Sequence, residues 1–160
     1  MDILGYEFNG IVQDHVVYRL NKKPSALTNY RYLIVSERID DVSSPWLDIF
    51  IVRDFNRVEK VLKRNLKKKI GLEVTLSGLR KTDGLQIGKW FNQIRELYKF
   101  CESSSCQFIL SSGANSLLEM ISGRSFDAIL KICDIKPERY WLELEEWLAN
   151  RNERRCFLTA

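Results

Sequence analysis

The alternation of apolar segments from Leu47 onward is the feature that most limits the folds open to this chain. The run Leu47–Val52 (LDIFIV) is apolar almost throughout, and such runs are typical of strands that are buried on both faces. Asp54 or Asn56 can then cap a helix over Arg57–Lys69, in which apolar residues recur at helical spacing. A buried strand followed by an amphipathic helix is the repeating unit of α/β folds.

Two more strand and helix pairs follow in the same order. Ile70–Leu76 is predicted to be a strand, and the longest helix signal of the chain covers Thr82–Cys101. The strand Gln107–Leu110 comes next, and the last two helices cover about Arg124–Ile132 and Pro137–Ala149. This spacing predicts βαβ units and a parallel sheet with right-handed crossovers.

Two apolar segments precede this alternation. Tyr30–Ser36 is predicted to be a strand, and Asn9–Leu20 is either one long strand or a hairpin. At 160 residues the chain fits a single domain, with N-terminal strands over about 1–40 and βα units and C-terminal helices over 47–150. A closed (β/α)8 barrel takes ~250 residues and rarely fewer than ~200. The predicted fold class is therefore α/β, a reduced or incomplete TIM-barrel-like β/α fold with mainly parallel strands.

The composition indicates a folded, intracellular protein. Hydrophobic residues make up 45% of the chain, which is typical of globular domains. No apolar run approaches the roughly 20 residues that a membrane span needs. The N-terminal sequence MDILGYEFNG has an early acidic residue and no basic region, unlike a secretory signal. We expect a cytoplasmic location.

The residues that carry enzyme chemistry are sparse. The chain has one histidine, His15, and a metal-dependent hydrolase needs several clustered histidine and carboxylate ligands. No Cys-x-x-Cys pair, G-x-S-x-G elbow, Walker A loop or G-x-G-x-x-G fingerprint is present in the sequence. A hydrolase using His15 with Ser111 or Ser112 is the weakest alternative. We expect that the isolated chain has no catalytic residues and itself binds no metal or cofactor.

A basic segment points instead to binding. The chain carries a net charge of +4, whereas Arg53–Lys69 alone holds eight basic residues against Asp54 and Glu59. Such a segment can offer one face to a polyanion, or it can be the solvated face of an amphipathic helix whose last cations complement the helix dipole. Both interpretations stay open. The candidate phosphate contacts are Arg57, Lys60, Lys63, Arg64, Lys67 and Lys68.

Further polar residues follow the predicted strands. Arg80 and Lys81 come just after one strand, Ser111-Ser112-Gly113 follow the next, and Arg124 opens the helix beyond. Because ligands of α/β sheets bind outside the carboxyl ends of the strands, we expect these residues to gather at that edge.

Residues 109–135, ILSSGANSLLEMISGRSFDAILKICDI, resemble a segment of the archaeal and eukaryotic ribonuclease P protein component 3 family. The family segment has Ser-Ser-Gly-Ala, then Arg-Ser-Pro-Arg-Asp, then an apolar helix. Here the matching positions are Ser111–Ala114, Arg124-Ser125 and Asp127. Weaker likenesses are Ser44–Ile49 to the family's Ser-Pro-x-x-Asp before a strand, Ile70–Leu79 to a later strand, and Leu4-Gly5-Tyr6 to an early Leu-Gly-Tyr.

The resemblance implies a TIM-barrel-like protein without catalytic metals. Members pair with a second ribonuclease P protein, as a heterodimer or heterotetramer, and help the catalytic RNA remove 5′ leaders from precursor tRNA. The endonucleolytic chemistry would then belong to Mg²⁺ held by the RNA. By the same resemblance, Arg124 is expected to contact RNA, and Ser111, Ser112 and Gly113 to shape a phosphate-facing turn.

The chain departs from the family pattern at several positions. When the segment is aligned without a gap, Phe126 and Asp127 stand where Pro-Arg is usual, so the second arginine is lost. Asn115 stands where lysine is frequent. The resemblance also does not extend to the family's first strand and helix. The alternatives to a ribonuclease P subunit are a protein–protein adaptor of α/β fold that does not bind RNA and, less favoured, a diverged phosphoesterase of the αβ-barrel class.

Overall fold

The strands pair in chain order, each parallel to the next. The computed structural model describes residues 2–3, 16–20, 32–65, 69–81, 84–114 and 119–156. Sequential parallel pairing is the strand order of β/α barrels, whereas the strand order of a doubly wound sheet reverses at a switch point. The predicted α/β class with a reduced, parallel β/α fold is therefore confirmed. The strands are β1 (Asp2–Ile3), β2 (Val16–Leu20), β3 (Tyr32–Ser36), β4 (Ile49–Ile51), β5 (Gly71–Thr75) and β6 (Gln107–Ser111).

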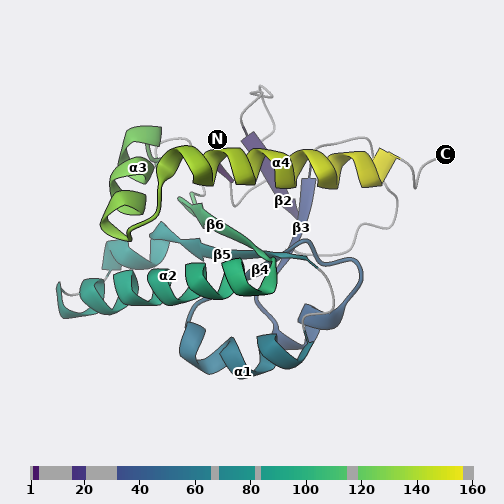
Figure 1. The fold of residues 1–160 in the computed structure, drawn as a ribbon, viewed down its shortest axis with the longest axis horizontal. Helices are drawn as coiled ribbons and strands as arrows, with labels where there is room; N and C mark the ends of the chain where they lie inside the picture. Colours follow the sequence, from purple (N-terminus) through teal and green to yellow (C-terminus); the bar gives the residue numbers. More distant parts are fainter. Residues whose placement is uncertain are drawn as a thin grey trace.

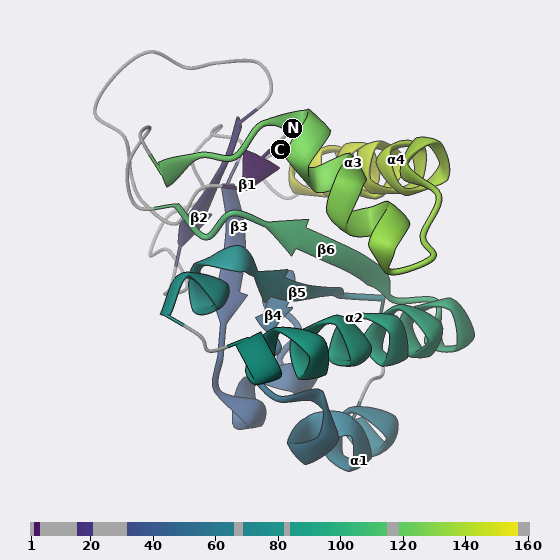
Figure 2. The same ribbon diagram turned by 90° about the vertical axis from the view of Figure 1, so that its left-hand side faces the viewer.

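Helices cover both sides of this sheet. Figure 1 shows α1 and α2 on one side and α4 crossing the other, and the turned view in Figure 2 shows α3 beside α4. The four α-helices lie where the sequence predicts them, although Lys69, the predicted end of α1, is not helical and α4 continues beyond the predicted end at Ala149. The helices are η1 (Ile39–Ser43), α1 (Phe55–Asn65), η2 (Leu76–Lys81), α2 (Gly84–Ser104), α3 (Gly123–Ile132) and α4 (Pro137–Cys156).

Side-chain caps set where α1 and α3 begin. Asp54 Oδ1 accepts a hydrogen bond from the Arg57 backbone N–H at 3.4 Å, so of the two candidate caps of α1 it is Asp54 that acts. Ser122 Oγ accepts from the Ser125 N–H at 3.3 Å at the start of α3. Such caps satisfy backbone donors that the first helical turn leaves unpaired.

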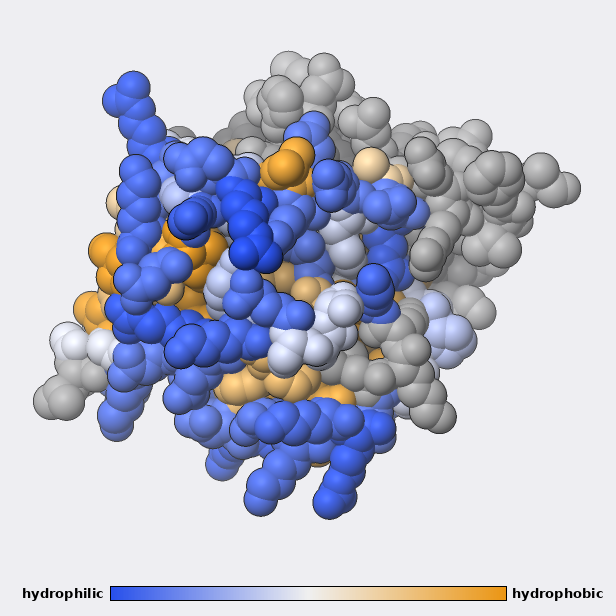
Figure 3. Space-filling model, in the orientation of Figure 1, coloured by the Kyte–Doolittle hydropathy of each residue, from blue (hydrophilic) through white to orange (hydrophobic). Residues whose placement is uncertain are grey.

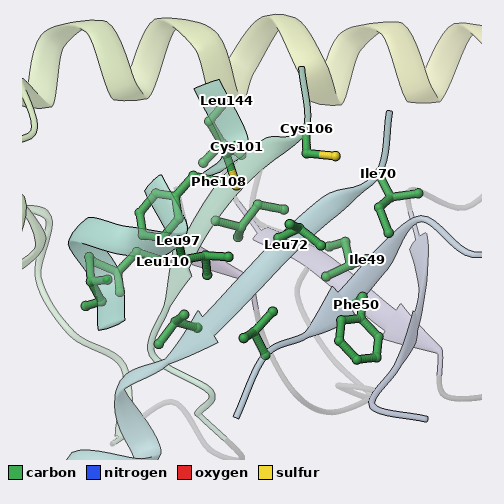
Figure 4. Close-up of a cluster of buried hydrophobic side chains, with 14 of the residues drawn as sticks. Ile49, Phe50, Ile70, Leu72, Leu97, Cys101, Cys106, Phe108, Leu110 and Leu144 are labelled. Carbon is green, nitrogen blue, oxygen red and sulfur yellow. The ribbon is translucent and has the colours of Figure 1, made fainter. Parts of the chain in front are cut away.

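Strands β4, β5 and β6 are largely buried on both faces, as the apolar run Leu47–Val52 predicts. Phe50, Leu72 and Phe108 are in register across β4, β5 and β6 and share one face. The ring of Tyr98 in α2 meets Phe108 edge-on at 5.7 Å, so this face lies under α2. On the opposite face, a Cβ atom added at Gly71 would lie 3.2 Å from Trp147 of α4. Figure 4 shows the buried side chains between these layers.

Two polar anchors hold α4 on the sheet. Arg151 Nη1 lies 3.5 Å from Asp48 Oδ1, and both side chains are largely buried. Asp48 Oδ2 also accepts a hydrogen bond from the Ile34 backbone N–H at 2.8 Å. Near the other end of the helix, the Tyr140 hydroxyl reaches the backbone of Leu110 in β6. Among the helices that the structure describes, none is long and apolar enough to cross a membrane.

Candidate nucleic-acid interface

The basic residues of α1 lie on one face of the helix. Arg57, Lys60 and Arg64 follow one another at i, i+3 and i+7, and all three are exposed. The opposite face carries the buried residues Phe55 and Leu62, which pack into the core. Figure 3 shows long hydrophilic side chains projecting from α1 along the lower edge of the molecule. The fold therefore presents these cations to solvent as a single surface, which we call the α1 basic face: Arg57, Lys60, Lys63 and Arg64.

Neighbouring carboxylates neutralise half of the α1 basic face. Lys63 Nζ lies 2.6 Å from Glu59 Oε1, and Arg57 Nε lies 3.8 Å from Asp54 Oδ2. For Lys60 and Arg64, by contrast, the described part of the chain provides no ion pair. Exposed ion pairs contribute only ~0–1 kcal/mol, so a phosphate group can displace the paired carboxylates. The two unpaired cations can contact a phosphate without that exchange.

A further cation lies beside α1, at the carboxyl end of β4. Arg53 Nε donates a hydrogen bond to Glu37 Oε2 at 2.8 Å, and Glu37 directly follows β3. Parallel neighbours bring the carboxyl ends of β3 and β4 together, although 16 residues separate these two side chains in the sequence. In the sequence, Arg53 is one of the eight basic residues of Arg53–Lys69. No local pattern indicates its hydrogen bond to Glu37.

The turn after β6 lies against the segment that follows β5. Gly113 has a φ of 61°, and a Cβ atom there would lie 2.8 Å from Ser77 Oγ and 3.0 Å from Thr75 Cβ. Ser77 belongs to η2, the short helix that also contains Arg80 and Lys81. The backbone thus brings these two predicted site segments side by side at the carboxyl edge of the sheet. The side chains of Arg80 and Lys81, and the whole of Lys67 and Lys68, lie outside the described residues.

The two serines of that turn are buried and bonded within the protein. Ser111 Oγ donates a hydrogen bond to a carboxylate oxygen of Glu73, and Ser112 Oγ accepts one from the Ala114 N–H at 3.1 Å. The part of the turn that a ligand can reach is therefore half-buried Gly113 and the backbone. Sequence reasoning missed Glu73, a buried carboxylate in β5; the available signal was an acidic residue inside an otherwise apolar strand.

Arg124 is exposed at the second residue of α3. Helix α3 is held against α4 by an edge-on contact of Phe126 with Trp141 at 6.0 Å and by a 2.8 Å hydrogen bond from Trp141 Nε1 to Asp127 Oδ1. Asp127 therefore contributes to packing. Figures 1 and 2 place α3 and α1 on opposite sides of the sheet, so Arg124 does not extend the α1 basic face.

Cys101, Cys106 and Cys133 are buried thiols. Burial raises the pKa of the Cys101 thiol well above its ordinary value, and burial likewise raises the pKa of Cys133 to about 11. Cys101 and Cys133 are therefore protonated near neutral pH, whereas the thiolate is the form that attacks electrophiles and binds metals. Among the described residues, no group of three or more His, Cys, Asp or Glu side chains could hold a metal ion. His15, the one candidate base, lies outside the described residues.

No family model matches this sequence, and no curated protein matches it.

Proposed function

We propose that this chain is an RNA-binding protein subunit of ribonuclease P that positions the catalytic RNA for removal of 5′ leaders from precursor tRNA. The observation that carries the RNA-binding part is the α1 basic face, whose cations lie together and exposed on one helix. Two features support the ribonuclease P part: the resemblance around Ser111–Ala114 and Arg124, and a parallel sheet whose strands follow chain order.

The proposed role is electrostatic. Each cation that neutralises a phosphate releases a condensed counterion, so the affinity falls as the salt concentration rises. On a duplex, each contact lowers the logarithm of the binding constant by about 0.9 for every tenfold rise in salt. Lys60 and Arg64 would make the first contacts, because neither has to leave a carboxylate. Cleavage would be performed by Mg²⁺ on the RNA, and the partners would be ribonuclease P RNA, a second protein subunit and, indirectly, precursor tRNA.

A protein–protein adaptor is the second candidate. It is favoured by the ion pairs that Arg53, Arg57 and Lys63 make with neighbouring carboxylates. A helix face whose charges are paired in this way can be the ordinary solvent-exposed face of an amphipathic helix and needs no RNA to explain it. An adaptor of this kind would bind structured RNA weakly and with little dependence on salt. The phosphoesterase alternative would need metal-dependent hydrolysis by the isolated chain that His15→Ala abolishes.

Two double variants with the same net charge test the α1 basic face. Lys60→Gln with Arg64→Gln removes the unpaired cations, whereas Arg57→Gln with Lys63→Gln removes the paired ones. We expect the first double variant to flatten the slope of log affinity against log salt by about 2, and the second by less than 1. Fluorescence anisotropy with a labelled RNA duplex measures both slopes.

The outcomes separate direct contact from general attraction. Equal slopes for the two double variants would show that only the overall charge matters, and would contradict the assignment of Lys60 and Arg64. Failure of the wild-type chain to bind the duplex at low salt would refute RNA binding through α1. For the ribonuclease P assignment, the native complex is purified and its RNA is sequenced; a complex without ribonuclease P RNA would refute it.

A further inference from the structure

The side chains that α1 and the residues just before it expose to solvent are all polar over the described residues 53–65. The exposed residues of this range are Arg53, Asn56, Arg57, Lys60, Lys63 and Arg64. The exposed large hydrophobic residues of the described chain lie in α2, α3 and α4, and they are Ile87, Ile132 and Leu142. Across this described range, the surface around the α1 basic face therefore offers charge and hydrogen-bonding groups, but no exposed aromatic ring on which a base could stack.

A surface of this composition suits a duplex better than a single strand. Proteins that bind single strands without sequence preference combine cations with aromatic side chains on which the bases stack. In a duplex the bases are already stacked on one another, and the phosphates carry most of the contacts. The counterions are also more concentrated around a duplex, where each contact releases about 0.9 of a counterion against about 0.7 on a single strand.

The cations of α1 are spread around the helix as well as along it. Successive residues are turned by about 100°, so Arg57 and Lys63 lie about 120° apart on the circumference, with Lys60 midway between them. Along the axis, Arg57 and Arg64 are about 10 Å apart, because each residue rises about 1.5 Å. Cations arranged in this way can reach the two rows of phosphates that border a groove, whereas a single strand offers one row.

The core holds α1 in place from its apolar side. The ring of Phe55 meets Phe100 of α2 at 5.5 Å, and Leu62 is fully buried. Because this side is occupied, α1 cannot bury it in a lipid bilayer as an interfacial helix does. A fixed helix loses little freedom when its cations meet the ordered phosphates of a duplex, whereas a single strand would have to be ordered on binding.

We propose that the RNA held by the α1 basic face is double-helical, and that it is bound through its phosphates without reading of the base sequence. This inference rests on the proposed function and names the class of RNA that the function requires. The contact is independent of sequence because every base pair presents the same phosphates. The chain would then lie on a base-paired region of its RNA partner.

The full chain is tested by fluorescence anisotropy against a labelled RNA duplex and against each of its two strands alone, designed not to fold on themselves. We expect the duplex to bind about tenfold more tightly than either strand. With four contacts, the difference in counterion release alone amounts to about sixfold in about 0.1 M salt, and ordering of the strand adds to it. A second duplex of shuffled sequence should bind within about twofold of the first.

Two double variants that lose the same charge test whether the preference resides in α1. Lys60→Gln with Arg64→Gln removes two of the four contacts, so the ratio of duplex to strand affinity should fall about two- to threefold. Lys99→Gln with Lys131→Gln is the matched control, because both lysines are exposed but lie in α2 and α3. The control should keep the ratio of the wild type.

The outcomes distinguish this inference from the proposed function. Equal affinities for the duplex and its strands would overturn the inference and leave RNA binding through α1 in place. Failure to bind either form at low salt would refute both. A ratio that is unchanged by the loss of Lys60 and Arg64 would place the duplex contact outside α1 and overturn the inference.

Vesicles of phosphatidylserine and phosphatidylcholine test the other polyanion that a basic face can meet. We expect the wild type to bind them much more weakly than the duplex, because α1 has no free apolar side to insert. Binding as tight as that of the duplex, and lost in the variant without Lys60 and Arg64, would assign the α1 basic face to a membrane surface and overturn the inference.

Discussion

Gly113 is the residue on which the turn after β6 depends. Its φ of 61° lies in the left-handed region, which glycine adopts freely and other residues adopt at a cost of about 1–2 kcal/mol. Thr75 and Ser77 also lie too close to leave room for a Cβ atom. Conformation and contact therefore both select glycine at this position.

Gly113→Ala should lower the free energy of unfolding by about 2 kcal/mol, from the backbone conformation and the contact with Ser77 together. Urea denaturation followed by circular dichroism measures the change. Gly123→Ala is the matched control, because no atom lies within 4 Å of a Cβ there and its φ is not positive. Equal losses in the two variants would contradict the role of the turn geometry.

Cys133 makes stability depend on pH in the alkaline range. Burial raises the pKa of its thiol to about 11 in the folded chain, whereas an unfolded thiol titrates near 8.5. Between these values the unfolded state loses the proton and the folded state keeps it. The contribution of Cys133 to the free energy of unfolding should therefore be constant below about pH 8 and fall as the pH rises toward 11.

Cys133→Ala should remove part of that alkaline fall while lowering stability at pH 7 by the loss of packing. Urea titrations at pH 7, 9 and 10 compare the variant with the wild type. An identical alkaline fall in both proteins would show that Cys133 stays accessible to hydroxide in the folded state.

At the scale of the elements, periodicity predicted most helices and strands but not their ends. The apolar spacing of α1, α2 and α3 is local information, so their positions could be predicted. Helix α4 extends past the predicted end to Cys156. Arg151 in this extension lies 3.5 Å from Asp48, a contact that no local pattern contains. The short helix η2 was not predicted, since the Ser77-Gly78 pair resembles an ordinary turn.

The α1 basic face shows the same division. The position of its cations on one face could be predicted from charge and spacing. Their exposure to solvent is expected both for an RNA-binding face and for the ordinary solvated face of an amphipathic helix. Which cations are paired is a matter of side-chain geometry. Lys63 could have been matched to Glu59 from their spacing of four residues, whereas Arg53 meets Glu37 only because β3 and β4 are neighbours.

At the scale of the whole molecule, Asp48 joins three parts of the chain. It accepts the N–H of Ile34 in β3, precedes β4, and lies 3.5 Å from Arg151 of α4. Asp48→Ala should lower the free energy of unfolding by about 3 kcal/mol, because a largely buried guanidinium would lose its carboxylate. Thermal and urea unfolding measure the loss.

Asp48→Asn separates the two roles of this side chain. The amide oxygen can still accept the Ile34 N–H, while the charge that faces Arg151 is gone. We expect a loss between that of Asp48→Ala and the wild type. A loss as large as that of Asp48→Ala would assign the whole effect to the ion pair, and a negligible loss would contradict its contribution.

The sequence by itself determined the α/β class, the order of strands and helices from Leu47 onward, and the concentration of positive charge on one helix, because these follow from periodicity and charge within a few residues. Only the tertiary structure decided that Ser111 and Ser112 are buried, that Arg124 lies apart from α1, and that the Tyr140 hydroxyl bonds the backbone of Leu110. The physical reason is that burial and contacts of this kind depend on residues distant in the chain, such as Glu73 for Ser111 and Leu110 for Tyr140, which packing of the sheet and helices brings together.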